Sequence, residues 1–327
     1  MESFITLSKL FGDHFNKRHF PAEPPNLYDA SQYILKIGGK RIRPICVLMG
    51  NDLFEEIDPD AYEVATAIEL FHNFSLIHDD IMDKAPLRRG METVHTKYGD
   101  STALLAGDVM LVAAYDHINN IKPLHMHRII ALFNKTAREV CEGQQLDMDF
   151  ENTKEVSFKE YERMITLKTS VLLASSLQIG AIIGGAGTGN QQHLYQFGKK
   201  LGIAFQVQDD YLDAFGDPEK FGKQPGGDIL ANKKTFLLIH AMDVATEEQK
   251  KVLNELMEKE ALHDDDKVDK VNKVLEIFRK CKVGEWAEEL KEKYYNEAMM
   301  HLEEIAVLSS RKKELELLAK YLLQRDK

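Results

Sequence analysis

The sequence predicts an all-α protein, and three observations support that prediction. Prolines lie at positions 21, 24, 25, 44, 59, 86, 123, 218 and 225, so residues 124–217 and 226–327 contain none. Because proline inside a helix removes a hydrogen bond and clashes with the preceding turn, such stretches permit long helices. Apolar residues near the C-terminus recur at every third or fourth position, as one stripe of a helix does: Trp286, Leu290, Tyr294, Ala298, Leu302 and Ile305. No run alternates apolar and polar residues in the way that would require a strand.

Residues that cap the first turn of a helix mark several expected helix starts. These are Asp100 and Ser101 before TALLAGDVMLVAAYDHI, the pair Ser157 and Glu160, and the pair Thr246 and Gln249. Residues 171–198 carry no charge, but polar residues and the glycine-rich tract 184–190 interrupt them, so we expect a buried core helix and not a membrane span. The cluster HDDDKVDK makes residues 258–269 an expected charged loop. The whole chain, 1–327, is expected to be a single domain of about a dozen helices.

Composition narrows the class of protein. The chain has 327 residues, of which 44% are hydrophobic, enough to bury a sizeable core. Its 42 Lys and Arg against 53 Asp and Glu give a net charge of −11, which argues against a general nucleic-acid binder, because such a surface must neutralise phosphates. Cys46, Cys141 and Cys281 are too few and too scattered for a disulfide framework or a zinc site, and they suit a reducing, cytoplasmic compartment. Core packing is the expected role of these cysteines and of Trp286.

The pattern Asp-Asp-x-x-Asp occurs three times, and its surroundings separate the copies. The copy at Asp265–Asp269 lies among other charged residues and is expected to face water. The copies at Asp79–Asp83 and Asp209–Asp213 lie in apolar helical sequence, where burying several like charges costs several kcal/mol unless positive charge compensates. The first and last aspartates of each copy project from one helix face. Paired carboxylates of this kind suit a hard divalent cation, and magnesium in particular if substrate phosphates supply further oxygens.

Basic residues near these motifs indicate what such cations would hold. GGKRIRP at residues 38–44 packs three cations into four positions after two glycines, and RRG at residues 88–90 follows the first acidic motif. Arginine binds phosphate oxygens through a planar fork, and lysine acts as a mobile point charge. His72 precedes Asp79 by about two turns and is therefore expected on the same face. The combination predicts a cavity that binds a diphosphate.

In their order and spacing these motifs resemble those of the trans-isoprenyl diphosphate synthases, the polyprenyl synthetase family. The resemblance runs from Gly38 to Thr235 and rests on GGKRIRP, LIHDDIMD, RRG, FQVQDDYLD and FGK. It implies an isoprenoid-synthase-type bundle of helices around a central cavity, usually in a homodimer, with the two acidic motifs facing one another. The implied reaction is the magnesium-dependent head-to-tail condensation of isopentenyl diphosphate with an allylic diphosphate.

The resemblance also implies roles by position. About three magnesium ions would be held by Asp79, Asp83 and Asp209, with Asp213 nearby. Isopentenyl diphosphate would be held by Lys40, Arg43, His72 and Arg89, and the allylic diphosphate by Arg88, Lys168, Lys223 and Lys233. Thr169 and Gln206 would lie beside the reacting carbon, and Gln144 with Asp147 near the cavity mouth.

The implied chemistry accounts for these residue types. The C–O bond of an allylic diphosphate breaks only if the departing diphosphate is stabilised, as magnesium, lysine and arginine can do. The resulting allylic cation requires a dry pocket, because water would quench it. The released diphosphate can take up the proton, so no protein nucleophile is required. Lys223 lies in FGKQPGGD, which is expected to form a loop that closes over bound substrate.

In this family, bulk just before the first acidic motif is expected to set the length of the product. Phe74 and Ser75 lie five and four residues before Asp79. A phenylalanine at the first of these positions resembles short-chain synthases, so geranylgeranyl diphosphate is the expected product, with farnesyl diphosphate as the second choice. Ser75 lies about 40° from Asp79 around the helix and Phe74 about 140°. Phe74 therefore closes the pocket only if the cavity bends toward it, and core packing is its alternative role.

Several alternatives stay open at this point. A class I terpene cyclase of the same fold also ionises a diphosphate, but its second metal motif usually contains Asn and Ser or Thr, and it lacks GGKRxRP. A non-catalytic partner subunit would be expected to have lost some of the carboxylates or basic residues. A helical scaffold has no need of clustered cations beside buried carboxylates. A calcium-binding module fits poorly, because no loop alternates oxygen ligands around a glycine.

Overall fold

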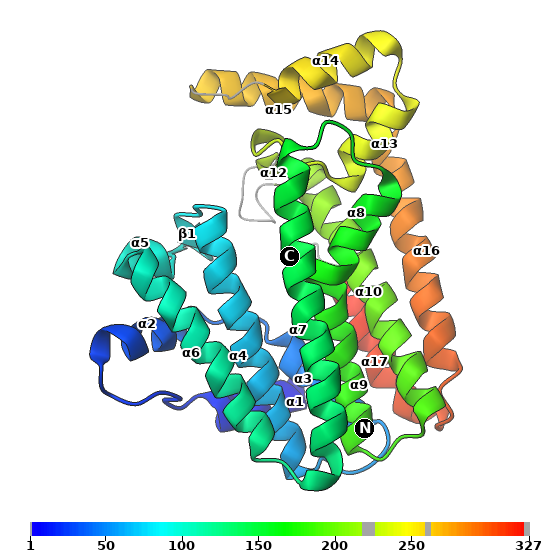
Figure 1. Cartoon of the computed structure of the whole chain (residues 1–327). Coiled ribbons are helices and arrows are strands. Elements are labelled where there is room, and N and C mark those ends of the chain that lie inside the picture. The colour runs from blue at the N-terminus through cyan, green and yellow to red at the C-terminus, as the bar shows by residue number, and fades with distance from the viewer. Residues whose placement is uncertain (1, 218–225, 259–262, 324–327) are drawn as a thin grey trace. The chain divides into compact units, whose positions relative to one another are not determined.

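The computed structural model describes residues 2–217, 226–258 and 263–323, and the chain divides into two compact units (Figure 1). The first unit comprises Met1–Thr136, Leu173–Tyr195 and Glu304–Leu315, and the second Ala137–Leu172, Gln196–Glu303 and Glu316–Lys327. In the described residues the regular structure is helical, apart from β1 (Leu87–Arg88) and β2 (Met91–Glu92), which pair antiparallel. The all-α prediction is confirmed, and the short hairpin is an addition to it. The single-domain assignment stays a prediction.

The first unit is built around α4 (Pro59–Met82). This helix starts where sequence rules predict a start, because the side chain of Asp58 accepts a hydrogen bond from the N–H of Asp60 and Pro59 occupies the first turn. It packs against α3 (Ile42–Asp52) and runs beside α6 (Asp100–Asn119) (Figure 1). The remaining helices of this unit include α1 (Phe4–Phe15), α2 (Pro25–Ile37), α5 (Val94–Tyr98) and most of α9 (Val171–Ile183).

Helices α3 and α9 cross with their backbones in direct contact. A Cβ atom at Gly50 would overlap the carbonyl oxygen of Leu177, and one at Gly180 would overlap that of Val47. The segment Phe158–Ile183 is the one helical stretch among the described residues that is long and apolar enough to cross a membrane. Of its most apolar window, 78% is buried inside the protein. The buried core helix predicted for residues 171–198 is therefore found as α9 over Val171–Ile183, whereas the rest of that range leaves the helix and enters α10 at Thr188.

The second unit holds most of the C-terminal helices. They are the later part of α7 (Pro123–Asn152), α8 (Phe158–Ile165), the π-helical turn η1 (Thr166–Ser170), most of α10 (Thr188–Phe215), α12 (Gly227–Leu230), α13 (Phe236–Val244), α14 (Glu247–Glu258), α15 (Asp264–Lys280), α16 (Val283–Glu303) and the end of α17 (Ser309–Leu323). Their apolar faces enclose a core that contains Phe236, Phe278 and Tyr294. Of the predicted stripe, Leu290 and Tyr294 belong to this core and Trp286 is half-buried against it. Ala298 and Leu302 are also buried on α16, whereas Ile305 lies beyond the end of that helix, in the first unit.

The predicted helix starts are found, and one predicted loop is wrong. Ser157 and Glu160 form a reciprocal capping box, as do Thr246 and Gln249. The helix expected after Asp100 and Ser101 is α6, but Asp100 is its first residue and Gly99 is its cap, without a capping hydrogen bond from a side chain. The expected charged loop at residues 258–269 is instead helical from Asp264 onward, where α15 begins; residues 259–262 lie outside the described residues. Its charges still face solvent, but they pair along a helix, as Asp269 and Lys273 do over 2.5 Å.

Candidate active site

The basic motif GGKRIRP forms a tight turn into α3. Gly38 and Arg41 have φ angles of 75° and 48°, so the chain passes through left-handed conformations just before the helix begins. Arg41 then reaches the N-terminal segment, where its Nη1 donates to Oδ1 of Asn16 over 2.8 Å. Arg43, in the first turn of α3, places its Nη1 3.1 Å from Nε2 of His72 on α4. Lys40 lies exposed in the turn itself.

His72 is a neutral hydrogen-bond acceptor. A guanidinium group has only N–H donors, so the ring nitrogen that faces Arg43 carries the lone pair. Burial lowers the pKa of His72 well below its ordinary value, and the positive charges of Arg43, Arg89 and Arg88 lower that pKa further. The structure thus gathers three of the residues predicted to hold isopentenyl diphosphate, namely Arg43, His72 and Arg89.

Arg89 reaches this cluster from the turn between β1 and β2. Its own φ angle is 54°, and its guanidinium group lies against Gly39: a Cβ atom there would come within 2.7 Å of Nη1. The second glycine of the motif therefore makes room for the arginine. Burial lowers the pKa of Arg89, and the charge of Arg88 acts in the same direction. A guanidinium group that is crowded by a second positive charge in this way is stabilised by an anionic ligand.

The first acidic motif ends α4. The N–H of Asp83 donates to the carbonyl oxygen of Asp79 over 2.8 Å, and the side chain of Asp83 is exposed whereas that of Asp79 is half-buried. Asp80 is only 2% exposed, and it accepts from Nε and Nη2 of Arg88 over 2.9 and 2.8 Å. Arg88 is therefore paired with the motif itself. Its predicted contact with the allylic diphosphate stays a prediction.

Phe74 and Ser75, the predicted determinants of product length, are both half-buried on α4. The ring of Phe74 lies 5.6 Å from that of Phe71 and 4.7 Å from that of His78. The hydroxyl of Ser75 donates to the carbonyl oxygen of His72 over 2.8 Å. Phe74 thus has the aromatic neighbours that core packing would give it, and its role in product length stays a prediction.

The second acidic motif lies on α10, in the second unit. Asp210 is 3% exposed, and its two oxygens accept from the hydroxyl of Tyr161 (3.0 Å) and from Nε2 of Gln206 (2.8 Å). Burial and the charge of Asp228 raise the pKa of Asp210 to about 8, although both hydrogen bonds oppose the rise. Asp209 and Asp213, the predicted metal ligands, are half-buried.

The chain folds back onto Asp213 just before α12. The N–H of Gly226 donates to the carbonyl oxygen of Asp213 over 2.6 Å, and the N–H of Asp228 donates to its Oδ2 over 2.9 Å. Nζ of Lys233 lies 3.9 Å from Oδ1 of Asp228. Burial, followed by repulsion from Asp213, raises the pKa of Asp228 to about 6. The sequence interpretation missed Asp228, for which the available signal is its place directly after the glycines of FGKQPGGD.

Lys168 and Thr169 lie in η1, where the helix widens for one turn. Nζ of Lys168 lies 2.6 Å from Oδ2 of Asp147, which pairs two predicted site residues. A Cβ atom at Gly143 would overlap the backbone of Lys168, so α7 and η1 touch there. Neighbouring Gln144 is buried, and neither polar atom of its side chain has a hydrogen-bond partner among the described residues. Lys223 lies outside the described residues.

The carboxylates fit a divalent cation by their charge. Among the side chains that the structure describes, no group of three or more His, Cys, Asp or Glu is arranged to hold a metal ion by itself. In the second unit, however, Asp213, Asp147 and Asp209 all repel the charge of Asp228. Such crowding is what a bound cation relieves, and carboxylate oxygens are the ligands that magnesium prefers when substrate oxygens complete its shell.

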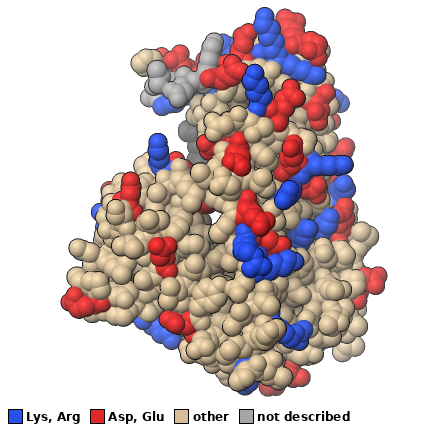
Figure 2. All heavy atoms as spheres, in the orientation of Figure 1, with Lys and Arg blue, Asp and Glu red and all other residues tan. Residues whose placement is uncertain are grey.

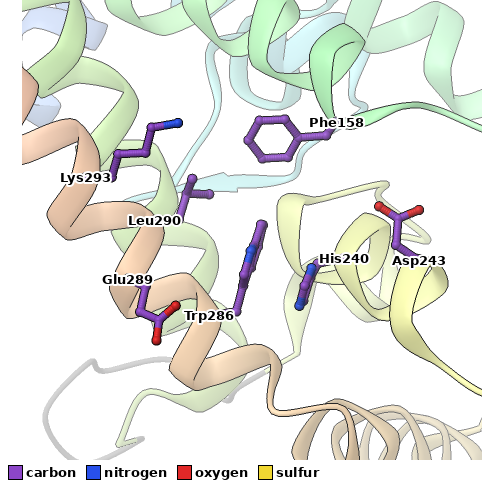
Figure 3. Close-up of a pocket in the computed structure, with 7 residues that line it drawn as sticks. All are labelled: Phe158, His240, Asp243, Trp286, Glu289, Leu290 and Lys293. Atoms are coloured by element: carbon purple, nitrogen blue, oxygen red, sulfur yellow. The ribbon is translucent and has the colours of Figure 1, made fainter.

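A separate pocket of about 440 Å³ lies in the second unit (Figure 3). Trp286 and His240 stack in parallel there with ring centroids 4.0 Å apart, and Phe158 meets the indole edge-on at 6.1 Å. Asp243, Glu289, Leu290 and Lys293 complete its lining. None of the predicted site residues lines this pocket.

Comparison with known proteins relates the chain to one family. The family model for polyprenyl synthetase matches residues 24–277. A short chain isoprenyl diphosphate synthase from Methanocaldococcus jannaschii is 40% identical over 258 residues, which cover 77% of this chain and 76% of the relative. A geranylgeranyl diphosphate synthase from Saccharolobus solfataricus is 38% identical, with 92% and 91% covered. A crystal structure of a geranylgeranyl pyrophosphate synthase matches with a TM-score of 0.95 and 40% identity, covering 99% of both chains.

Proposed function

Because this chain belongs to the polyprenyl synthetase family, we propose that it is a prenyltransferase that condenses isopentenyl diphosphate with an allylic diphosphate head to tail. The products are diphosphate and a short-chain trans-prenyl diphosphate. Geranylgeranyl diphosphate is the first choice of product and farnesyl diphosphate the second, since the relatives include geranylgeranyl diphosphate synthases and Phe74 precedes the first acidic motif. The observation that carries the proposal is the neutral, half-buried His72 beside the cations of Arg43 and Arg89.

That cluster is suited to the diphosphate of the isopentenyl substrate. Arg43 and Arg89 supply forked N–H donors, Lys40 supplies a mobile charge from the turn, and His72 stays uncharged. The allylic diphosphate is assigned to Arg88, Lys168, Lys223 and Lys233. Magnesium, with about three ions in the complete site, is assigned to Asp79, Asp83, Asp209 and Asp213, and when bound it stabilises the departing diphosphate as a Lewis acid.

The remaining steps fall to the chain and its substrates. As the C–O bond of the allylic diphosphate breaks, the oxygens of Thr169 and Gln206 face the developing cation without attacking it. The double bond of isopentenyl diphosphate then forms the new C–C bond, and the released diphosphate takes up the proton that leaves. Apolar surroundings keep water from the cation throughout.

We also propose a cytoplasmic homodimer. In Figure 2 charged side chains lie densely over the part of the chain that contains α14 and α15, and more sparsely, with uncharged surface between them, over α2 and α6. On α6, four large apolar side chains are exposed: Leu104, Leu105, Val112 and Tyr115. An exposed apolar surface on one helix is the usual mark of a protein–protein interface.

Product mass tests the reaction directly. The protein is incubated with isopentenyl diphosphate, one allylic diphosphate and magnesium, and the prenyl diphosphates are identified by mass spectrometry. The proposal expects a longer prenyl diphosphate, and no turnover after chelation of magnesium. A cyclic hydrocarbon made from the allylic substrate alone would identify a terpene cyclase. If neither substrate is consumed, the protein is a partner subunit or a scaffold. Repeating the assay with Phe74→Ala tests whether Phe74 limits the length of the product. If it does, the variant makes longer products; an unchanged product distribution would show that another residue sets the limit.

A further inference from the structure

Glu69 is a buried carboxylate on α4 that the proposed reaction does not use. Its side chain is 7% exposed, and Oε1 accepts a hydrogen bond from Nδ2 of Asn73 over 3.1 Å. The same nitrogen donates to the backbone carbonyl of Glu69 over 2.8 Å, which fixes the amide in place. Oε2 is buried and has no hydrogen-bond partner among the described residues. A buried carboxylate with an unsatisfied oxygen is costly unless positive charges lie close to it.

The positive charges near Glu69 are those of the diphosphate-binding cluster. Glu69 lies three residues before His72, so the two side chains are neighbours on the helix surface. Arg41, Arg43 and Arg89 all attract its carboxylate and so oppose the rise in its pKa that burial causes. The attraction is mutual, because Glu69 counteracts the lowering of the pKa of Arg89.

A counter-charge here has a consequence for geometry. The guanidinium groups of Arg43 and Arg89 are carried on flexible side chains, and they repel one another as well as Arg88. Without an anion nearby, such groups move apart and toward water. Glu69 is anchored by Asn73 and therefore supplies a fixed point of attraction before any substrate is bound.

We propose that Glu69 is a positioning residue for isopentenyl diphosphate: its anchored carboxylate holds the guanidinium groups of Arg43 and Arg89 together so that both meet the same diphosphate. The inference rests on the proposed function of that cluster. It predicts the opposite of a simple charge effect. If Glu69 acted only as a distant negative charge, its removal would strengthen the binding of an anion; if it positions the arginines, its removal weakens that binding.

The variant Glu69→Gln separates these outcomes, because it keeps the shape and the acceptor for Asn73 but removes the charge. Steady-state kinetics are measured for each substrate at saturating concentration of the other, and binding of isopentenyl diphosphate is measured by calorimetry. We expect the KM and Kd for isopentenyl diphosphate to rise about tenfold, with the KM for the allylic diphosphate and kcat little changed. Glu69→Asp keeps the charge and should restore part of the loss. Glu63→Gln, on the same helix but paired with His117, is the matched control and should leave both KM values unchanged.

A folded Glu69→Gln protein with an unchanged or lower KM for isopentenyl diphosphate overturns the inference, and so does an equal rise in both KM values. Melting temperature identifies a variant that fails to fold. In that case Glu69→Asp tests the inference, because its shorter side chain displaces the carboxylate. An unchanged affinity for isopentenyl diphosphate in this variant would contradict a role of Glu69 in positioning the arginines. If the wild-type protein binds isopentenyl diphosphate but does not turn over, the proposed function fails while the calorimetric comparison still tests Glu69.

Discussion

At the scale of single residues, the second aspartate of each acidic motif differs from its neighbours. Asp80 is buried and held by the fork of Arg88, and Asp210 is buried and held by Tyr161 and Gln206. The first and last aspartates of both motifs are less buried and do not share these bonds. The buried members therefore fix the local structure, and the outer members are the predicted metal ligands.

Two conservative substitutions test this division of roles. Asp80→Asn removes the charged partner of a partly buried arginine, and we expect it to lower the free energy of unfolding by about 2 kcal/mol. Asp83→Asn changes an exposed side chain, and we expect a change in stability below about 0.5 kcal/mol but a loss of kcat of about a hundredfold. Urea unfolding and steady-state kinetics measure both quantities. The assignment is contradicted if Asp83→Asn destabilises the protein more than Asp80→Asn does.

The sequence was sufficient to find the two acidic motifs, but not to predict which aspartate of each motif is buried. Helical spacing places Asp79 and Asp83 on one face whatever their partners are. The burial of Asp80 depends on Arg88, which arrives from a hairpin whose next residue, Arg89, has a left-handed backbone. Asp228 was missed for a similar reason, since it meets Asp213 only because the chain folds back through Gly226. Local sequence patterns do not show which residues distant in the sequence come into contact in this way.

At the scale of elements, the contact between α7 and η1 sets the position of Lys168. Capping boxes at Ser157 and Thr246 were predictable because each is completed within four residues. The π-helical form of η1 was not predictable in this way, because it accompanies a close approach of another helix at Gly143. The helical start of α15 was also misjudged, since a charged, exposed first turn has the composition of a loop.

The approach at Gly143 gives a prediction for this contact. Gly143→Ala would drive a methyl group into the backbone of Lys168, so we expect a loss of about 1–3 kcal/mol in the free energy of unfolding. Because Lys168 moves with η1, kcat should fall as well. Gly189→Ala is the control: it lies in α10 with no atom near the added methyl group, and helix propensity alone should stabilise it by about 0.5–1 kcal/mol. Similar unfolding curves for the two variants would contradict this prediction, because they would show that α7 can shift to make room for the methyl group at little cost in stability.

At the scale of the whole molecule, the exposed face of α6 predicts the assembly. Taking Leu104 as zero, Leu105, Val112 and Tyr115 lie at about 100°, 80° and 20° around the helix axis, so all four share one arc. Asp108 lies on the same arc, 3.8 Å from Nε2 of His78. An exposed apolar stripe on a helix whose opposite face is packed against α4 is what an isologous dimer contact uses, because each copy offers the other the same apolar surface.

Sedimentation equilibrium tests that assembly. We expect the wild-type protein to sediment at twice the chain mass of 37.3 kDa at micromolar concentration. Leu105→Asp places a charge on the stripe, and because burying an unpaired charge costs several kcal/mol, the variant should sediment as a monomer at the same concentration. Ile5→Asp is the control, since Ile5 is even more exposed than the stripe residues but lies on α1, and it should leave the dimer intact. A monomeric wild-type protein, or a dimer that tolerates Leu105→Asp, would exclude α6 as the interface.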